Sequence, residues 1–145
     1  MSIALLDVNV LIALLWPWHE HYEGARRWYQ KEHRRGWATC TITEAGFVRI
    51  SAQTAGGFVL QEAIEVLEKM CDKSEHHFWP LDGSVRGILP EIRELIHGHQ
   101  QLTDALLLDL AIRRGGRLAT LDTKIRSLLA SDSAHAQSIE VIPLH

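Results

Sequence analysis

The chain has 145 residues and 46% of them are hydrophobic, which fits one globular domain with a real core and excludes a disordered protein. Its formal charge of −3 is weak evidence against a broad nucleic-acid-binding surface. Cys40 and Cys71 form no CxxC pair, so a small disulfide framework is excluded and reduced thiols in the cytoplasm are expected. Asp7 and Asn9 interrupt the apolar N-terminus, and no basic region precedes it. We therefore expect a single domain over residues 1–145, without a signal peptide or a membrane-spanning helix.

The first part of the chain predicts strands that alternate with helices. Residues 3–6 are apolar and predict a short buried strand, and residues 8–15 predict an apolar helix. Residues 19–35 carry apolar side chains at helical spacing, and Gly36 ends that helix. Residues 37–40 then predict a second strand.

The middle of the chain predicts mainly helix. Residues 41–53 form one predicted helix, and the glycine pair at 56–57 ends it. Residues 60–71 repeat apolar side chains at helical spacing. Residues 76–80 predict a third strand, and residues 84–97 predict a helix with a kink at its internal proline.

The last part of the chain again predicts strands that alternate with helices. Residues 103–114 predict a strongly apolar helix that ends at the glycine pair 115–116. Residues 117–121 predict a strand, residues 123–130 a helix, and residues 139–143 a final strand. Short apolar strands that alternate with helices predict an α/β fold in which a parallel sheet is covered by helices on both faces. Ligands of such sheets bind at the carboxyl ends of the strands.

Four carboxylates occur where ordinary packing does not put them. Asp7 ends the apolar run IALL and Asp122 ends the run RLATL, whereas Glu44 and Asp104 stand in the first turns of predicted helices. Four acids from distant segments repel one another if they converge, and a divalent cation with oxygen ligands compensates that repulsion. The pattern therefore favours a Mg²⁺ or Mn²⁺ site and the hydrolysis of a phosphodiester.

Each of the four acids also has a simpler explanation. Any of them could cap a helix or interact with a helix dipole, and taken singly these explanations remain open. No GxSxG, HExxH, P-loop or GxGxxG motif offers a competing catalytic set. The nine histidines form no metal-binding pattern. Asp109, five residues after Asp104, points away from it on a helix and is interpreted as a structural or dimer-interface residue.

Four segments of the sequence resemble a known family. The runs LLDVNVLIALL, TEAGFVRI, LTDALLLDLA and RLATLD are similar, in this order, to motifs of PIN-domain ribonucleases, and in particular of VapC-like toxins from bacterial toxin–antitoxin pairs. The resemblance extends over almost the whole chain. It implies a PIN-like fold with a short five-stranded parallel sheet, a metal-dependent endoribonuclease activity on RNA, a cognate antitoxin protein and a homodimer.

The resemblance also implies roles for individual residues. The family's acidic quartet falls on the four acids above. Three of them are expected to bind Mg²⁺ directly: Asp7, Asp104 and Asp122. Glu44 is expected to hold a water molecule or a second ion. Asn9 and Thr120 are expected to orient the carboxylates.

Two other functions are compatible with the sequence. The first is a PIN-type metal nuclease that acts in RNA maturation or DNA processing without an antitoxin, and a comparison of RNA with DNA cleavage separates it from a toxin. The second is a catalytically inactive PIN-like binding module. The presence of all four acids argues against an inactive module, and a metal titration tests it.

Overall fold

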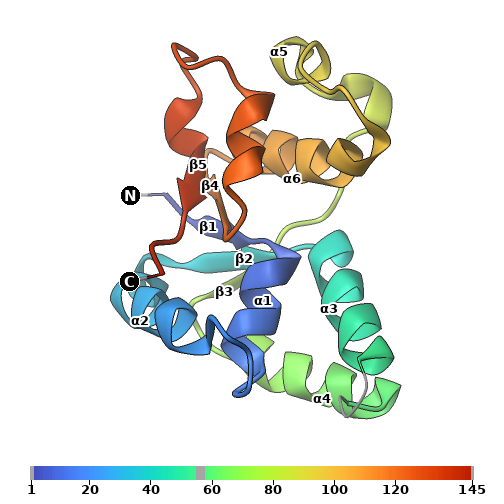
Figure 1. The fold of residues 1–145 in the computed structure, drawn as a ribbon, viewed down its shortest axis with the longest axis vertical. Helices are drawn as coiled ribbons and strands as arrows, with labels where there is room; N and C mark the ends of the chain where they lie inside the picture. The colour runs from blue at the N-terminus through green and yellow to red at the C-terminus, as the bar shows by residue number, and fades with distance from the viewer. Residues whose placement is uncertain (1, 55–57, 145) are drawn as a thin grey trace.

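The computed structural model describes residues 2–54 and 58–144, which form a sheet between two layers of helices (Figure 1). The sheet has five parallel strands in the order β3-β2-β1-β4-β5. The strands are β1 (Ala4–Leu6), β2 (Trp37–Thr39), β3 (His76–Phe78), β4 (Arg117–Thr120) and β5 (Ile139–Val141). The five-stranded parallel sheet expected from the sequence is confirmed.

Helices connect the strands. The α-helices are α1 (Val8–Leu15), α2 (Tyr22–Glu32), α3 (Thr41–Gln53), α4 (Leu60–Cys71), α5 (Pro90–Arg93) and α6 (Leu102–Arg113). The 3-10 helices are η1 (His33–Arg35), η2 (Val85–Gly87), η3 (His99–Gln101), η4 (Thr123–Leu128) and η5 (Ala136–Ser138). Within the described residues, no helix is long and apolar enough to span a membrane.

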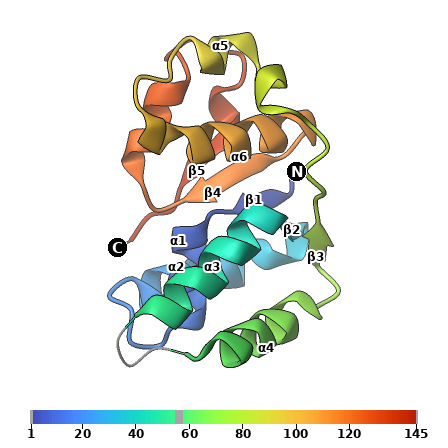
Figure 2. The ribbon, with the colours of Figure 1, turned by 90° about the vertical axis from the view of Figure 1, so that its right-hand side faces the viewer.

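The two faces of the sheet carry separate hydrophobic cores. Side chains alternate between faces along a strand, so Ala4 and Leu6 of β1 point to one core and Leu5 to the other. Figure 2 shows α1 to α4 on one side of the sheet, with α5 and α6 on the other. All residues of β1, β2 and β4 are buried, which fits central strands that are covered on both faces.

Several predicted elements are confirmed and one is wrong. The helices expected at 41–53 and 60–71 have those bounds, whereas the single helix expected at 84–97 is replaced by η2 and the short α5. Pro90 begins α5 rather than kinking a longer helix, because proline lacks a backbone N–H and fits the first position of a helix. Leu89 before it has a ψ of 132°, which is outside the helical region, as is usual for a residue that precedes proline. The glycine pair at 56–57 lies outside the described residues.

Other boundaries also differ from the prediction, and four of the strands end one or two residues earlier than expected. The helix expected at 19–35 begins only at Tyr22 and becomes 3-10 helix at His33, while the helix expected at 123–130 is entirely 3-10. The topology is unaffected. Strands β1 and β4 are neighbours, with Leu6 opposite Ala119. Their carboxyl ends therefore lie side by side, and each is followed at once or nearly at once by an aspartate.

Candidate active site

Asp7 stands at the carboxyl end of β1 and begins α1. Its backbone is extended, and its carboxylate Oδ1 accepts a 2.8 Å hydrogen bond from the Val8 N–H as the N-cap of the helix. Its own N–H donates to Ala119 O at 3.0 Å, which continues the pairing of β1 with β4. Asp7 is only 7% exposed. The capping explanation is therefore correct for this residue, but the carboxylate is also held at a sheet edge where ligands bind.

A hydroxyl and an amide fix the orientation of the Asp7 carboxylate. The Thr120 hydroxyl donates to Asp7 Oδ2 at 2.7 Å, and the Asn9 amide donates to the same hydroxyl oxygen at 3.2 Å. Asn9 in turn accepts a 3.2 Å hydrogen bond from the Leu121 N–H. Thr120 is fully buried. The structure thus places Asn9 and Thr120 around the first aspartate, where the resemblance implied that they lie.

Asp7, Asp104 and Asp122 line one cavity of about 500 Å³. Asp122 follows β4, and its backbone N–H donates a 3.2 Å hydrogen bond to the Thr120 hydroxyl oxygen. Its carboxylate caps η4 by accepting a 2.9 Å hydrogen bond from the Lys124 N–H. Asp104 lies in the first turn of α6, on the other side of the sheet from α1. Strand ends and helix starts from distant segments therefore bring three carboxylates together.

The charges of these three carboxylates oppose one another. Burial raises the pKa of Asp7, and the nearby charge of Asp122 raises it further, although hydrogen bonds from Thr120 and Val8 act in the opposite direction. The pKa of Asp104 is raised from 3.8 to about 6, first by burial and then by the charges of Asp7 and Asp122. Three mutually repelling oxygen donors in a half-buried cavity are what a hard divalent cation neutralises. The residues present therefore fit a Mg²⁺ or Mn²⁺ ion.

Two cationic or ionisable side chains also line the cavity. Arg49, from the run TEAGFVRI, is exposed on α3, and His19 is partly buried after α1. Burial and the neighbouring His21 lower the pKa of His19, although the charge of Glu20 acts in the opposite direction. Sequence reasoning missed both residues. Arg49 lies five positions after Glu44 inside a recognised motif, which was the available signal.

Glu44 does not line this cavity, so the cavity brings together three of the four carboxylates that were expected to converge. Its carboxylate Oε2 accepts a 2.6 Å hydrogen bond from the Thr39 hydroxyl and lies beside Cys71 and His76. The helical rotation of α3 explains this position. The residues of α3 that line the cavity are Ile42, Gly46, Arg49 and Ile50. At about 100° per residue, Glu44 lies about 200° around the helix from Ile42 and faces α4 instead.

The packing of α3 on α1 fixes that rotation. A Cβ on Gly46 would lie 2.5 Å from Val8 Cγ2, so this face of α3 presses directly against the start of α1. A glycine is required here for close approach rather than for backbone conformation. Because Gly46 must face α1, Glu44 cannot.

Asp109 has the structural role expected for it. The side chain is 7% exposed, accepts a 2.9 Å hydrogen bond from Leu89 N–H and forms a 2.8 Å ion pair with Arg113. These contacts attach α6 to the start of α5. Asp109 is therefore not part of the acidic cavity.

Comparisons with known proteins identify the family to which this arrangement belongs. Residues 4–128 match the sequence model of the family described as PIN domain. The chain belongs to the PIN-domain family. It is 43% identical over 145 residues to Ribonuclease VapC39 of Mycobacterium tuberculosis, with 96% of this chain and 99% of the relative covered. It is 38% identical over 141 residues to Ribonuclease VapC44 of the same organism, with the same coverage of each chain. This PIN domain is thus similar to VapC proteins over nearly its full length.

Solved structures share the fold of this PIN domain. VapBC2 from Rickettsia felis, bound to a DNA fragment from its promoter, aligns with a TM-score of 0.64 and 16% identity over 97% of this chain and 99% of that chain. DNA-bound VapBC from Salmonella typhimurium aligns with a TM-score of 0.64 and 19% identity over 99% and 100%. At these identities the likeness supports the fold alone.

Proposed function

We propose that this PIN domain is a divalent-metal-dependent endoribonuclease toxin that hydrolyses RNA phosphodiester bonds. The observation that carries the proposal is the convergence of Asp7, Asp104 and Asp122 in one cavity. The curated relatives that cover almost all of this chain are named ribonucleases, which supports RNA as the substrate. Mg²⁺ is the proposed ion, and Mn²⁺ should substitute for it because both accept carboxylate oxygens.

The proposed metal ligands are the three carboxylates of the cavity. A bound divalent cation supplies charge neutralisation at the scissile phosphate and activation of water for in-line attack. Thr120 holds Asp7 Oδ2 through its hydroxyl, and Asn9 holds Thr120, so that the carboxylate keeps one rotamer. Glu44 is not assigned to this set, because its carboxylate is bound to Thr39 on the other side of α3.

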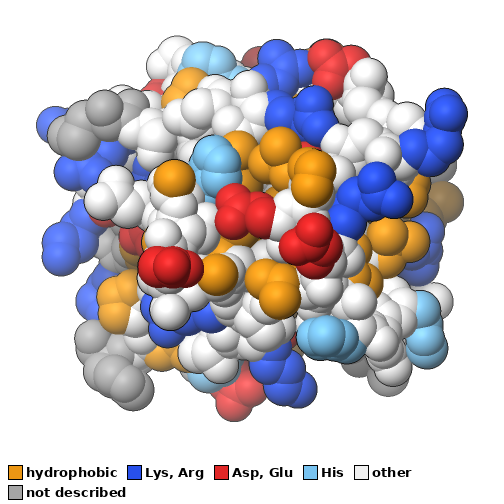
Figure 3. All heavy atoms as spheres, turned by 90° about the horizontal axis from the view of Figure 1, so that it is seen from above, with side chains coloured by type: hydrophobic (Ala, Val, Ile, Leu, Met, Phe, Trp, Pro, Cys, Tyr) orange, Lys and Arg blue, Asp and Glu red, His pale blue; other side chains and the backbone are white. Residues whose placement is uncertain are grey.

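Arg49 is proposed to contact the RNA backbone. It is exposed at the edge of the acidic cavity, and a guanidinium can bind a phosphate oxygen pair in a fixed geometry. The distribution of charged side chains on the surface supports a local rather than a broad contact with RNA. On the face seen in Figure 3, acidic and hydrophobic side chains occupy the middle while Lys and Arg lie mostly toward the edges.

A cognate antitoxin and a second copy of the chain are the proposed protein partners. The two solved structures compared above are VapB–VapC complexes, which supports an antitoxin that keeps this protein inactive. Co-expression with the antitoxin should relieve the growth arrest that the protein causes alone. A homodimer is proposed from the family resemblance, and sedimentation that shows only monomer at micromolar concentration would contradict it.

The function is tested by comparing RNA and DNA substrates with and without chelator. RNA should be cleaved only after Mg²⁺ or Mn²⁺ is restored, and DNA should remain intact. Cleavage of structured DNA would favour the alternative of a PIN-type nuclease in nucleic-acid processing. Full activity in excess chelator would refute the metal-dependent mechanism.

A further inference from the structure

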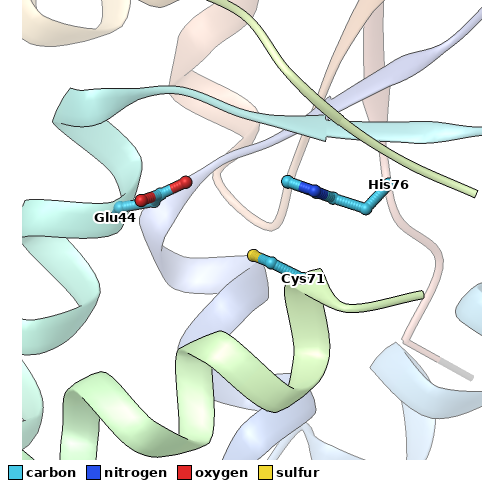
Figure 4. A group of neighbouring side chains, drawn as sticks. All are labelled: Glu44, Cys71 and His76. Atoms are coloured by element: carbon cyan, nitrogen blue, oxygen red, sulfur yellow. The ribbon is translucent and has the colours of Figure 1, made fainter. Parts of the chain in front are cut away.

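A second group of side chains lies on the far side of α3 from the acidic cavity. Glu44 of α3, Cys71 at the end of α4 and His76 at the start of β3 each offer one ligand atom, and these atoms all lie within 4.8 Å of one another. Figure 4 shows the Glu44 carboxylate and the His76 ring directed toward one another, with the Cys71 sulfur beside the space between them. All three side chains are partly exposed, so an ion from solvent can reach them.

We propose that Glu44, Cys71 and His76 form a second metal site, which takes a borderline transition cation of the Zn²⁺ class. The donor set decides the class of ion. A thiolate, an imidazole and a carboxylate are the ligands of Zn²⁺, whereas Mg²⁺ prefers oxygen ligands alone. The protein therefore separates two ions by chemistry, with a hard cation in the acidic cavity and a softer one between α3, α4 and β3.

The distances are close to those that a bound ion needs. Zn²⁺ bonds of roughly 2.0 Å to nitrogen or oxygen and 2.3 Å to sulfur place tetrahedral ligand atoms about 3.3–3.6 Å apart. Because the three ligand atoms already lie within 4.8 Å of one another, inward movements of at most about 1 Å bring them to these separations. Only four residues separate Cys71 from His76, so the short connection between α4 and β3 holds two of the three ligands close together. Three protein ligands leave one tetrahedral position for water.

Thr39 holds the site open in the absence of metal. Its hydroxyl donates to Glu44 Oε2 at 2.6 Å and lies 2.7 Å from His76 Nε2. Because the single hydroxyl proton goes to Glu44, the Thr39 oxygen accepts from His76 in the tautomer that carries the proton on Nε2. The backbone carbonyl of Cys71 also lies beside the His76 ring, and ligating histidines commonly donate their second N–H to such a carbonyl.

Metal binding must displace a proton from Cys71. In the metal-free protein, burial and then the Glu44 charge raise the pKa of the Cys71 thiol to about 11. The metal–sulfur bond forms as the S–H bond breaks, and the proton leaves to buffer. The bound ion then joins the end of α4 and the start of β3 to α3.

The test uses the full-length protein, stripped by chelator and supplied with excess Mg²⁺ to occupy the acidic cavity. Co²⁺ replaces Zn²⁺ as the spectroscopic probe, because cobalt bound to a thiolate absorbs in the near ultraviolet. The wild-type protein should show this band with one ion per chain. Zn²⁺ at about 100 times its dissociation constant should raise the melting temperature by roughly 5–9 °C.

Matched variants locate the ligands. Cys71→Ser should lose the thiolate band, and His76→Ala should weaken Co²⁺ binding at least tenfold, by about the change that loss of one ligand causes. Cys40→Ala and His77→Ala remove a thiol and an exposed imidazole outside the site, and both should keep the band. Melting without metal establishes that each variant is folded, and Cys71→Ala replaces Cys71→Ser if the latter is not.

Either of two results would overturn the second site. One is a wild-type spectrum without a thiolate band, and the other is a band that persists in the Cys71 variants. RNA cleavage is not a readout here, so the outcome is independent of the proposed nuclease activity.

Discussion

The substitution Asp104→Asn distinguishes a metal ligand from an acid that only stabilises the start of α6. The substitution keeps the shape of the side chain and its place in the first turn of α6 but removes its charge. The pKa of Asp104 is raised from 3.8 to about 6 by burial and by the charges of Asp7 and Asp122. The difference corresponds to a cost of about 3 kcal/mol for the ionised form. Because the side chain is partly exposed, solvent screening reduces this cost to about 1–2 kcal/mol.

The sign of the effect follows from the direction of the pKa shift. A carboxyl whose pKa is raised in the folded state binds its proton more tightly there than in the unfolded chain. The destabilisation of the folded protein by the ionised Asp104 carboxylate is therefore absent below pH 3.8, grows as pH rises toward about 6, and is fully present above that value. In chelator at pH 7.5, Asp104→Asn should melt roughly 3–7 °C above the wild type. At pH 5 the difference should fall to about half.

The same variant should lose RNA cleavage by at least about two orders of magnitude in Mg²⁺, the scale on which a missing charged ligand acts. Both properties are measured side by side, by thermal melting without metal and by RNase rate with Mg²⁺. Asp132→Asn is the matched control, because Asp132 is exposed and lies outside the cavity. It should change neither property. A well-folded Asp104→Asn protein that cleaves RNA at the wild-type rate would refute the assignment and leave the helix-end explanation.

Three other substitutions test the parts around the cavity. Thr120→Val removes the hydroxyl that donates to Asp7 and should raise the Mg²⁺ concentration for half-maximal cleavage about 10- to 100-fold, and an unchanged Mg²⁺ titration would count against this role. Asp109→Ala leaves the Leu89 N–H without its acceptor and should cost about 1–3 kcal/mol in denaturant unfolding, with cleavage by the folded fraction unchanged. Arg49→Ala should weaken RNA binding and make it less dependent on salt, since one phosphate contact is lost. An identical salt slope would place Arg49 outside the RNA contact.

The positions of Asp7 and Asp122 could be predicted because two simple rules place them. Each follows a short apolar run, and parallel strands bring their carboxyl ends to the same edge of a sheet. Once β1 and β4 pair, the two aspartates meet without any detail of packing. The helices at 41–53 and 60–71 were equally predictable, because their apolar spacing and the start and stop residues agree.

Glu44 could not be placed by the same rules. Its distance along the chain from a strand end is suitable, but its direction depends on how α3 rotates against α1. That rotation is set by the contact of Gly46 with Val8, which is a tertiary contact that periodicity does not reveal. For the same reason the grouping of Glu44 with Cys71 and His76 was missed, since its members come from three elements. The prediction of one helix over residues 84–97 was wrong because Pro90 is equally compatible with a kink and with a helix start.

The most direct test of the acidic site is anomalous diffraction from crystals of the protein soaked in Mn²⁺. The proposed function predicts an anomalous peak in the cavity, within bonding distance of carboxylate oxygens of Asp7, Asp104 and Asp122. The peak should disappear in crystals of the Asp104→Asn protein. Mn²⁺ that supports RNA cleavage in solution but gives no peak between these three carboxylates would contradict the assignment of the catalytic metal to this cavity.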